Sequence, residues 1–337
     1  MLRATCTRRL LPAAVVVVVV LAAMPVAAGA RPAPHGRRAA VTAPGASLTT
    51  FDFPDPSVLP ANGAYWAYAT RTAWEPRGHV FGVLRSTDLV HWRKVGDALS
   101  SPPRWTGGHW WAPSVLEVGG QFLLYYSAQE RGHGDHCIGL AVSGRPQGPF
   151  LDRGPLACGD PDTAGYIDPA PFQDADGSIY LYLSVDGPSH ELAVIPLTPD
   201  GLTAAGPLVT LLGVNQAWQR GLADETVEGP APVLHDGRYY LLYSTGSYRS
   251  DYRMGYAVAA SALGPFVDAP TNPMLVGGPL TAPGGGSVFD GPGGPWLAFH
   301  AWRGPANYAR GGARTLRAAP LVWAGEQLGV AAPGGAG

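Results

Sequence analysis

The stretch Asp55-Pro56-Ser57-Val58-Leu59 opens a pattern that recurs five times along the chain. Most copies join proline to small and aliphatic residues, and each lies just upstream of an apolar run rich in tyrosine or phenylalanine. The copies begin, in steps of roughly 57, 56, 60 and 57 residues, at Asp55, Ala112, Asp168, Glu228 and Gly285. A period of this size is typical of radial repetition or an array. The sequence therefore predicts an all-β fold, a five-bladed β-propeller.

The segments between the copies support an all-β fold. Glycine and proline interrupt nearly every apolar run, so no long stretch has the spacing of an amphipathic helix. Short runs with strand character remain, at Tyr65–Ala69, Phe122–Tyr126, Ile179–Leu183 and Tyr239–Tyr243. The stretches Asp174–Gly177 and His235–Gly237 are typical of hairpin turns, because an Asp-Gly pair tolerates the positive backbone angles of a tight turn.

The N-terminal residues predict export. Arginines precede an apolar run from Leu10 to about Ala28, and small residues follow it, which is the layout of a secretory signal peptide over residues 1–30. The run is also near the length of a membrane span, so an uncleaved anchor is the alternative. Residues 31–47 have the composition of a flexible leader, and residues 48–330 are expected to form one propeller domain. We expect a secreted, extracellular protein without stable membrane association.

Composition argues against several classes of partner. The net charge is −2 at pH 7 and only 14% of the residues are charged. Such a balance does not favour nucleic acid or an acidic membrane surface as a partner.

Two cysteines remain once the predicted signal peptide, which contains Cys6, is removed. In an oxidising exterior, Cys137 and Cys158 are expected to form one disulfide. The alternative is a pair of separately buried thiols.

Three of the five repeat starts carry a carboxylate: Asp55, Asp168 and Glu228. Each could instead be a turn residue, as an aspartate before proline usually is. In a propeller, however, successive repeat starts face one axis, so we expect the three groups to share a pocket. Mutual repulsion would raise at least one pKa and leave an acid beside a base. Hydrolysis of a glycosidic bond with inversion requires that combination.

Three phrases resemble the catalytic signatures of glycoside hydrolase family 43: Asp52–Val58, Tyr166–Phe172 and Val227–Pro232. The similarity extends from about Asp52 to Trp323. It implies a five-bladed propeller that hydrolyses arabinose- or xylose-containing polysaccharides with inversion. By resemblance, Asp55 is the general base, Glu228 the general acid and Asp168 the carboxylate that orients the acid and tunes its pKa.

The resemblance implies further site residues. Trp111 matches an aromatic platform for a sugar, although packing in the core is the alternative for Trp111 and for its neighbour Trp110. Arg314 resembles an arginine that reaches the bound sugar. His300 matches a histidine near the axis that contacts calcium, often through water. Gly285 departs from many relatives, which carry a histidine there, so the chain is expected to bind one structural calcium ion at the axis or none, and no organic cofactor.

A further similarity indicates the class of substrate. The stretch His136–Ala141, together with Cys158, is similar to family members that release arabinofuranose from α-1,5-linked arabinan. We therefore expect an α-L-arabinofuranosidase or arabinanase acting on oligosaccharides or polysaccharides of the arabinan or arabinoxylan type. A β-xylosidase of the same family and a non-catalytic, lectin-like propeller are the alternatives.

Overall fold

The structure is a computed structural model of the 337-residue chain, and it describes residues 45–72, 78, 80–159, 165–188 and 190–331. The predicted signal peptide (residues 1–30) and residues 31–44 of the predicted leader lie outside the described residues. Within the described part, no helix combines the length and the hydrophobicity that crossing a membrane requires.

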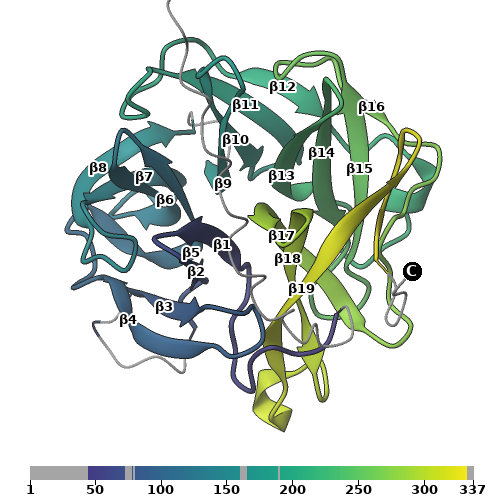
Figure 1. Cartoon of the computed structure of the whole chain (residues 1–337), viewed down its shortest axis with the longest axis horizontal. Helices are drawn as coiled ribbons and strands as arrows, with labels where there is room; N and C mark the ends of the chain where they lie inside the picture. Colours follow the sequence, from purple (N-terminus) through teal and green to yellow (C-terminus); the bar gives the residue numbers. More distant parts are fainter. Residues whose placement is uncertain (1–44, 73–77, 79, 160–164, 189, 332–337) are drawn as a thin grey trace, which may run out of the picture. The chain divides into compact units, whose positions relative to one another are not determined.

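Five sheets, each of four antiparallel strands consecutive in the sequence, are arranged around one axis (Figure 1). The first contains β1 Ser57–Ala61, β2 Ala64–Tyr68, β3 Val80–Ser86 and β4 Arg93–Leu99. The second contains β5 Thr106–Val118, β6 Gln121–Glu130, β7 His136–Ser143 and β8 Leu151–Cys158. The third contains β9 Tyr166–Gln173, β10 Ile179–Val185, β11 Glu191–Leu197 and β12 Val209–Leu212.

The fourth sheet contains β13 Glu228–His235, β14 Arg238–Thr245, β15 Arg253–Ala259 and β16 Val267–Asp268. The fifth contains β17 Thr281–Gly291, β18 Gly294–Arg303, β19 Ala313–Ala324 and β20 Gln327–Val330. Two short 3₁₀ helices are described, at Ala217–Gln219 and Tyr308–Arg310. The predicted all-β, five-bladed propeller is confirmed, and the four predicted strands coincide with β2, β6, β10 and β14 to within one residue at their starts.

The first strand of each blade lies nearest the axis (Figure 1). These five strands contact one another in the order β1, β5, β9, β13 and β17, and β17 returns to β1. The repeated phrases therefore line the centre of the ring. Because strands in a blade alternate their side chains between two faces, each blade packs on both neighbours.

Aromatic side chains of the second strands fill the space between blades. Tyr68, Tyr125 and Tyr182 are fully buried at equivalent positions of β2, β6 and β10. Each hydroxyl donates a hydrogen bond to a backbone carbonyl of the next blade, at Pro146, Gly201 and Ala262 respectively. A buried tyrosine thus contributes apolar area and still finds a partner for its hydroxyl.

Two local predictions are confirmed. Cys137 of β7 and Cys158 of β8 form a disulfide. Asp236 and Gly237 connect β13 to β14 with φ of 47° and 72°, as a two-residue hairpin turn requires.

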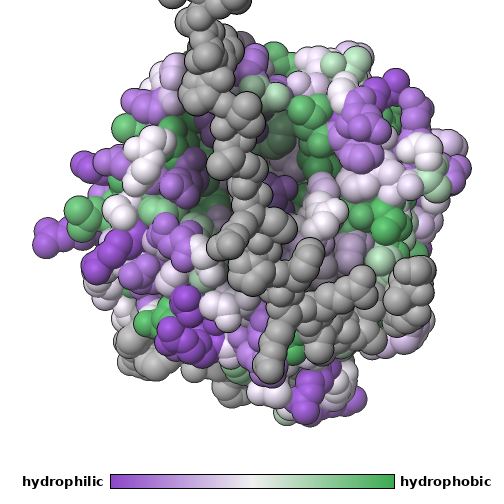
Figure 2. Space-filling view, in the orientation of Figure 1, coloured by the Kyte–Doolittle hydropathy of each residue, from purple (hydrophilic) through white to green (hydrophobic). Residues whose placement is uncertain are grey.

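The start of the described chain packs on the fifth blade. The backbone N–H groups of Leu48 and Phe53 donate to the carbonyls of Leu316 and Arg314 in β19. Arg317 donates to the carbonyl of Gly45, within the last residues of the predicted leader. On the face seen in Figure 2, hydrophilic and hydrophobic residues are interspersed among the atoms that are coloured.

Candidate active site

The backbone of each blade start has a positive φ, and this marks the equivalent residues. The five are Asp55 (49°), Ala112 (42°), Asp168 (55°), Gly229 (62°) and Gly285 (56°). The repeat pattern in the sequence, which makes Glu228 equivalent to Asp55 and Asp168, is therefore wrong by one residue at this blade. Gly229 takes that position, because glycine adopts the left-handed region without steric penalty.

Strand register gives Glu228 its true equivalents. Glu228 pairs with Ser244 of β14, just as Trp111 pairs with Ser127 and Ile167 with Ser184. Glu228 thus lies one residue before the positive-φ position. The expected convergence nevertheless occurs, because both positions face the same cavity.

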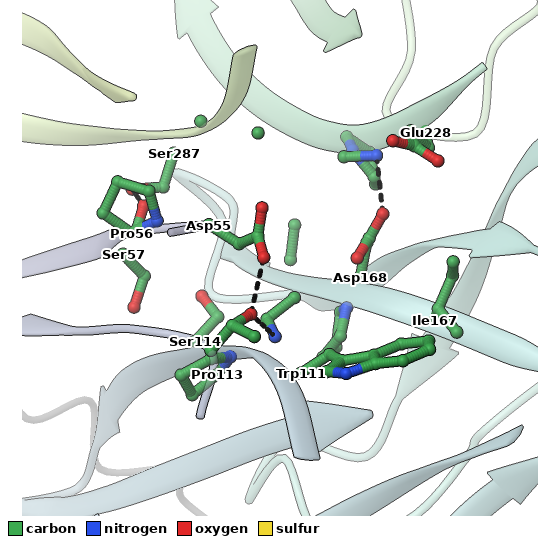
Figure 3. A pocket seen from close by; sticks show the side chains of 18 of the residues that line it. Asp55, Pro56, Ser57, Trp111, Pro113, Ser114, Ile167, Asp168, Glu228 and Ser287 are labelled. Carbon is green, nitrogen blue, oxygen red and sulfur yellow. Dashed lines mark hydrogen bonds between the residues drawn. The ribbon is translucent and has the colours of Figure 1, made fainter. Parts of the chain in front are cut away.

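That cavity has a volume of about 300 Å³ and is lined by all five innermost strands. Figure 3 shows Asp55, Asp168 and Glu228 around it, with Trp111 along one wall. Arg314 also lines it. Five of the six sequence-predicted site residues are therefore brought together, and the sixth, His300, lies behind Asp55.

Asp55 is held at its backbone and at both carboxylate oxygens. Thr70 Oγ1 donates a hydrogen bond of 2.6 Å to Oδ2 (Figure 3). Arg314 Nη1 lies 3.6 Å from Oδ1. The backbone N–H of Asp55 donates to His300 Nδ1 at 3.1 Å. This carboxylate has a fixed orientation at the start of β1.

Asp168 is tied to the neighbouring blade. Its Oδ2 accepts a hydrogen bond of 3.0 Å from the backbone N–H of Gly229, the residue after Glu228 (Figure 3). Burial, followed by the negative charges of Glu228 and Asp55, raises the pKa of Asp168 well above its ordinary value. Asp168 therefore fixes the peptide that carries Glu228.

Glu228 has the properties of a proton donor near neutral pH. Tyr252 donates a hydrogen bond of 2.6 Å to Oε1. Burial raises the pKa of Glu228 to about 7, against the lowering effect of that hydrogen bond. Within the described residues no hydrogen bond is formed to Oε2, so this oxygen is available to carry the proton of a side chain that lines the cavity.

Arg314 is buried between aromatic rings. Its guanidinium lies 4.5 Å from the ring centre of Tyr248, and its Nε donates to the hydroxyl of Tyr308 at 2.7 Å. The backbone N–H of Arg314 donates to Asp52 Oδ1. Arg314 is therefore a buried cation of the cavity wall and not a surface charge.

Trp111 presents one face to the cavity, because histidines cover the other. His109 stacks on its indole at 4.5 Å between ring centres, and His136 lies 4.8 Å from it. The two imidazoles are joined by a hydrogen bond of 3.1 Å, so they lie on the same side of the indole. Asp186 in turn pairs with His136 Nδ1 at 3.1 Å. Trp110 instead packs against a core cluster.

Sequence reasoning missed three contributors: Thr70, Tyr248 and Tyr252. All three lie between the second and third strands of a blade: Thr70 and Tyr248 follow β2 and β14, and Tyr252 directly precedes β15. Because these connections meet the blade starts at one face, polar and aromatic residues in them could have been considered as site residues from the sequence.

Among the described residues, no compact group of His, Cys, Asp and Glu side chains that could ligate the predicted calcium directly includes His300. His300 Nδ1 accepts a hydrogen bond from Asp55, and Nε2 is buried without a partner in the described structure. Burial lowers the pKa of His300 to about 3, so the ring is neutral. Calcium also prefers six to eight oxygen ligands. Among described residues, the His, Cys, Asp and Glu cluster compact enough for a metal is Glu130, Cys137 and Cys158, whose cysteines are bonded to each other.

Gly285 has no room for a side chain. A Cβ atom there would lie 2.7 Å from Asp55 Oδ1 and 2.7 Å from His300 Cε1, at a φ of 56°. Asp55 and His300 therefore occupy the space that any side chain at position 285 would need, and glycine fits there.

We expect Gly285→Ala to destabilise the fold by about 2 kcal/mol or more, because backbone strain and overlap add. Gly63→Ala is the matched control, since Gly63 has a φ of 68° and nothing within 4 Å of a Cβ; about 1 kcal/mol is expected there. Thermal denaturation of both variants measures the difference, and equal shifts in Tm would contradict the crowding at Gly285.

Known proteins similar to this chain are glycoside hydrolases. A model of the family "Glycosyl hydrolases family 43" matches residues 47–327. The β-D-galactofuranosidase xynD of Aspergillus niger is 32% identical over 255 residues, which are 70% of this chain and 70% of that protein. The extracellular endo-α-(1→5)-L-arabinanase 1 of Bacillus subtilis is 28% identical over 254 residues, 71% of this chain and 75% of that protein. A crystal structure of a thermostable family-43 glycoside hydrolase matches with a TM-score of 0.76 at 30% identity, covering 87% of this chain and 96% of that one.

Proposed function

Because this chain belongs to glycosyl hydrolases family 43, and is therefore a glycoside hydrolase, we propose that the axial cavity is its active site and that it hydrolyses arabinofuranosides with inversion. One observation carries the assignment: Asp55, Asp168 and Glu228, from three blades, line a single cavity. The family membership favours an enzyme over the lectin-like module.

The proposed roles follow from the contacts of each group. Glu228, with a pKa raised to about 7, donates its proton to the leaving oxygen as the glycosidic C–O bond breaks. Asp55, held by Thr70 and Arg314, takes a proton from the water that attacks the anomeric carbon from the opposite side. Asp168 orients Glu228 through the N–H of Gly229. Turnover leaves Asp55 protonated and Glu228 ionised, and exchange with solvent restores both.

The sugar is proposed from the relatives. One relative is named as acting on arabinan and another as a galactofuranosidase. α-L-Arabinofuranose and β-D-galactofuranose have the same ring configuration and differ in the substituent outside the ring. A furanose resting on Trp111 and reached by Arg314 is therefore the proposed occupant, with an arabinan or arabinoxylan-type chain as the natural substrate. Galactofuranosides are the second candidate, and β-xylosides the third.

The test is turnover on p-nitrophenyl α-L-arabinofuranoside, β-D-galactofuranoside and β-D-xyloside and on debranched arabinan, with product sizes followed. Release of arabinose supports the proposal, and proton NMR of the first-formed product should show the inverted anomer. Turnover confined to the xyloside, or a product with retained configuration, would contradict it.

Secretion is proposed on two grounds. The chain contains a disulfide, which persists in oxidising compartments, and an arabinanase relative is named as extracellular. N-terminal sequencing of protein from the culture medium should find a start near Arg31, and a start at Met1 in a membrane fraction would contradict this proposal.

The activity is expected to fall as the pH rises through the pKa of Glu228, because a general acid must be protonated. The hydroxyl of Tyr252 lowers that pKa by stabilising the carboxylate. Tyr252→Phe should therefore raise it and move the basic limb of the kcat profile to higher pH. Tyr239→Phe, which removes a hydroxyl bonded to Asp174 in a hairpin turn, is the control. A basic limb that stays in place or moves to lower pH in Tyr252→Phe would argue against Glu228 as the acid.

A further inference from the structure

Adjacent blades are joined near the axis by a repeated hydrogen bond. In four junctions, the N–H of the positive-φ residue donates to a hydroxyl at the end of the preceding blade's second strand. The pairs are Ala112 with Thr70 (2.9 Å), Asp168 with Ser127 (2.9 Å), Gly229 with Ser184 (3.1 Å) and Gly285 with Ser244 (3.0 Å). We call these bonds the axial belt. All four hydroxyl residues are buried.

The fifth junction closes the ring and differs in chemistry. Here the N–H of Asp55 donates to Nδ1 of His300, at 3.1 Å. His300 pairs with Gly284 of β17, the register that Ser244 has with Glu228 and Ser127 with Trp111. An imidazole thus occupies the place of a hydroxyl, and its belt partner is the proposed general base.

We propose that His300 is the positioning residue of Asp55: its unprotonated Nδ1 closes the axial belt and holds the base at positive φ, a role that requires no bound metal. This inference rests on the proposed function of Asp55.

Three observations support the assignment. A backbone N–H can donate to Nδ1 only when that nitrogen carries no proton, so the proton resides on Nε2. Nε2 is buried and has no partner in the described structure, whereas Nδ1 lies close to both the backbone N–H (3.1 Å) and Oδ1 (3.3 Å) of Asp55. Tyr252 stacks on the ring at 5.8 Å between ring centres. Gly285 leaves space for this arrangement, since any Cβ there would overlap both partners.

The bond matters for catalysis because of where it acts. Asp55 is a residue other than glycine in the left-handed region, a conformation that persists only when neighbours hold it. Without His300, the backbone at Asp55 is free to relax, and the carboxylate would leave its position relative to Thr70 and Arg314. A displacement of about 1 Å at a reacting group can lower a rate by about 10²-fold.

The experiment compares His300→Ala, His300→Asn and Ser244→Ala. Asparagine Oδ1 is bonded to Cγ, as is histidine Nδ1, so asparagine can accept the same hydrogen bond. Ser244→Ala removes the belt bond to Gly285, which has no side chain to position. We expect His300→Ala to lower kcat by about 10²-fold with KM little changed, His300→Asn to recover most of it, and Ser244→Ala to lower Tm with a much smaller loss of kcat.

Two results would overturn the inference. One is an equal loss of kcat in Ser244→Ala and His300→Ala, which would mean that the bond is only structural. The other is a loss of wild-type activity on chelation that added calcium restores, since His300 would then act through a metal.

A measurement on the resting wild-type enzyme keeps the test independent of turnover. The side-chain ¹⁵N resonances of His300, assigned by their absence in His300→Asn, should show an unprotonated Nδ1 and a protonated Nε2. A proton on Nδ1 would overturn the inference even if the enzyme is active. If no glycoside is hydrolysed, the proposed function fails, and the tautomer still reports on the axial belt.

Discussion

Glu228→Gln is expected to lower kcat on arabinan oligosaccharides by a factor of about 10² to 10⁴, the usual contribution of a general acid. Glutamine has nearly the same shape and can still accept the hydrogen bond from Tyr252, but it has no proton to give to the leaving oxygen. Steady-state kinetics on the oligosaccharides measure the loss.

The leaving group provides a sharper test of that role. p-Nitrophenolate departs without protonation, so the loss caused by Glu228→Gln should be much smaller on the aryl glycoside than on the oligosaccharide. Glu225→Gln is the matched control, because this carboxylate lies three residues away and is 45% exposed in an ion pair with Arg220. Equal losses on both substrates would exclude Glu228 as the acid.

Asp55→Asn is expected to lower kcat by a factor of about 10² to 10⁴ on both kinds of substrate. Every substrate needs the attacking water to lose a proton, whatever its leaving group. Asparagine also tolerates positive φ, so the backbone at this position is preserved.

Azide distinguishes a missing base from a damaged site. It attacks without giving up a proton, so azide should restore turnover to Asp55→Asn and yield a glycosyl azide of inverted configuration. Asp236→Asn, in an exposed hairpin turn, should leave kcat unchanged. A loss in Asp55→Asn that depends strongly on the leaving group would assign the acid role to Asp55 instead.

The number of blades and the positions of the second strands were predictable because short sequence patterns specify them and recur in successive blades. The spacing of the proline phrases sets the number of blades, and aromatic runs mark the second strands. The carboxylates could be gathered into one site because ring symmetry brings repeat starts together. The one-residue error at Glu228 arose because Glu-Gly-Pro can be aligned with Asp-Pro in two registers, and only the positive φ of Gly229 decides between them.

The sequence by itself thus determined the five-bladed ring, the disulfide and the residues that can supply an acid and a base. Only the tertiary structure decided which side chains form hydrogen bonds to Asp55 and Glu228. Thr70 reaches Asp55 and Tyr252 reaches Glu228 within their own blades, whereas His300 closes the ring onto Asp55 from 245 residues away. The last bond joins residues that meet only after the blades pack, and the pKa of Glu228 depends on the burial that the same packing creates. No local sequence pattern specifies the contact between His300 and Asp55, because only closure of the ring brings the fifth blade next to the first.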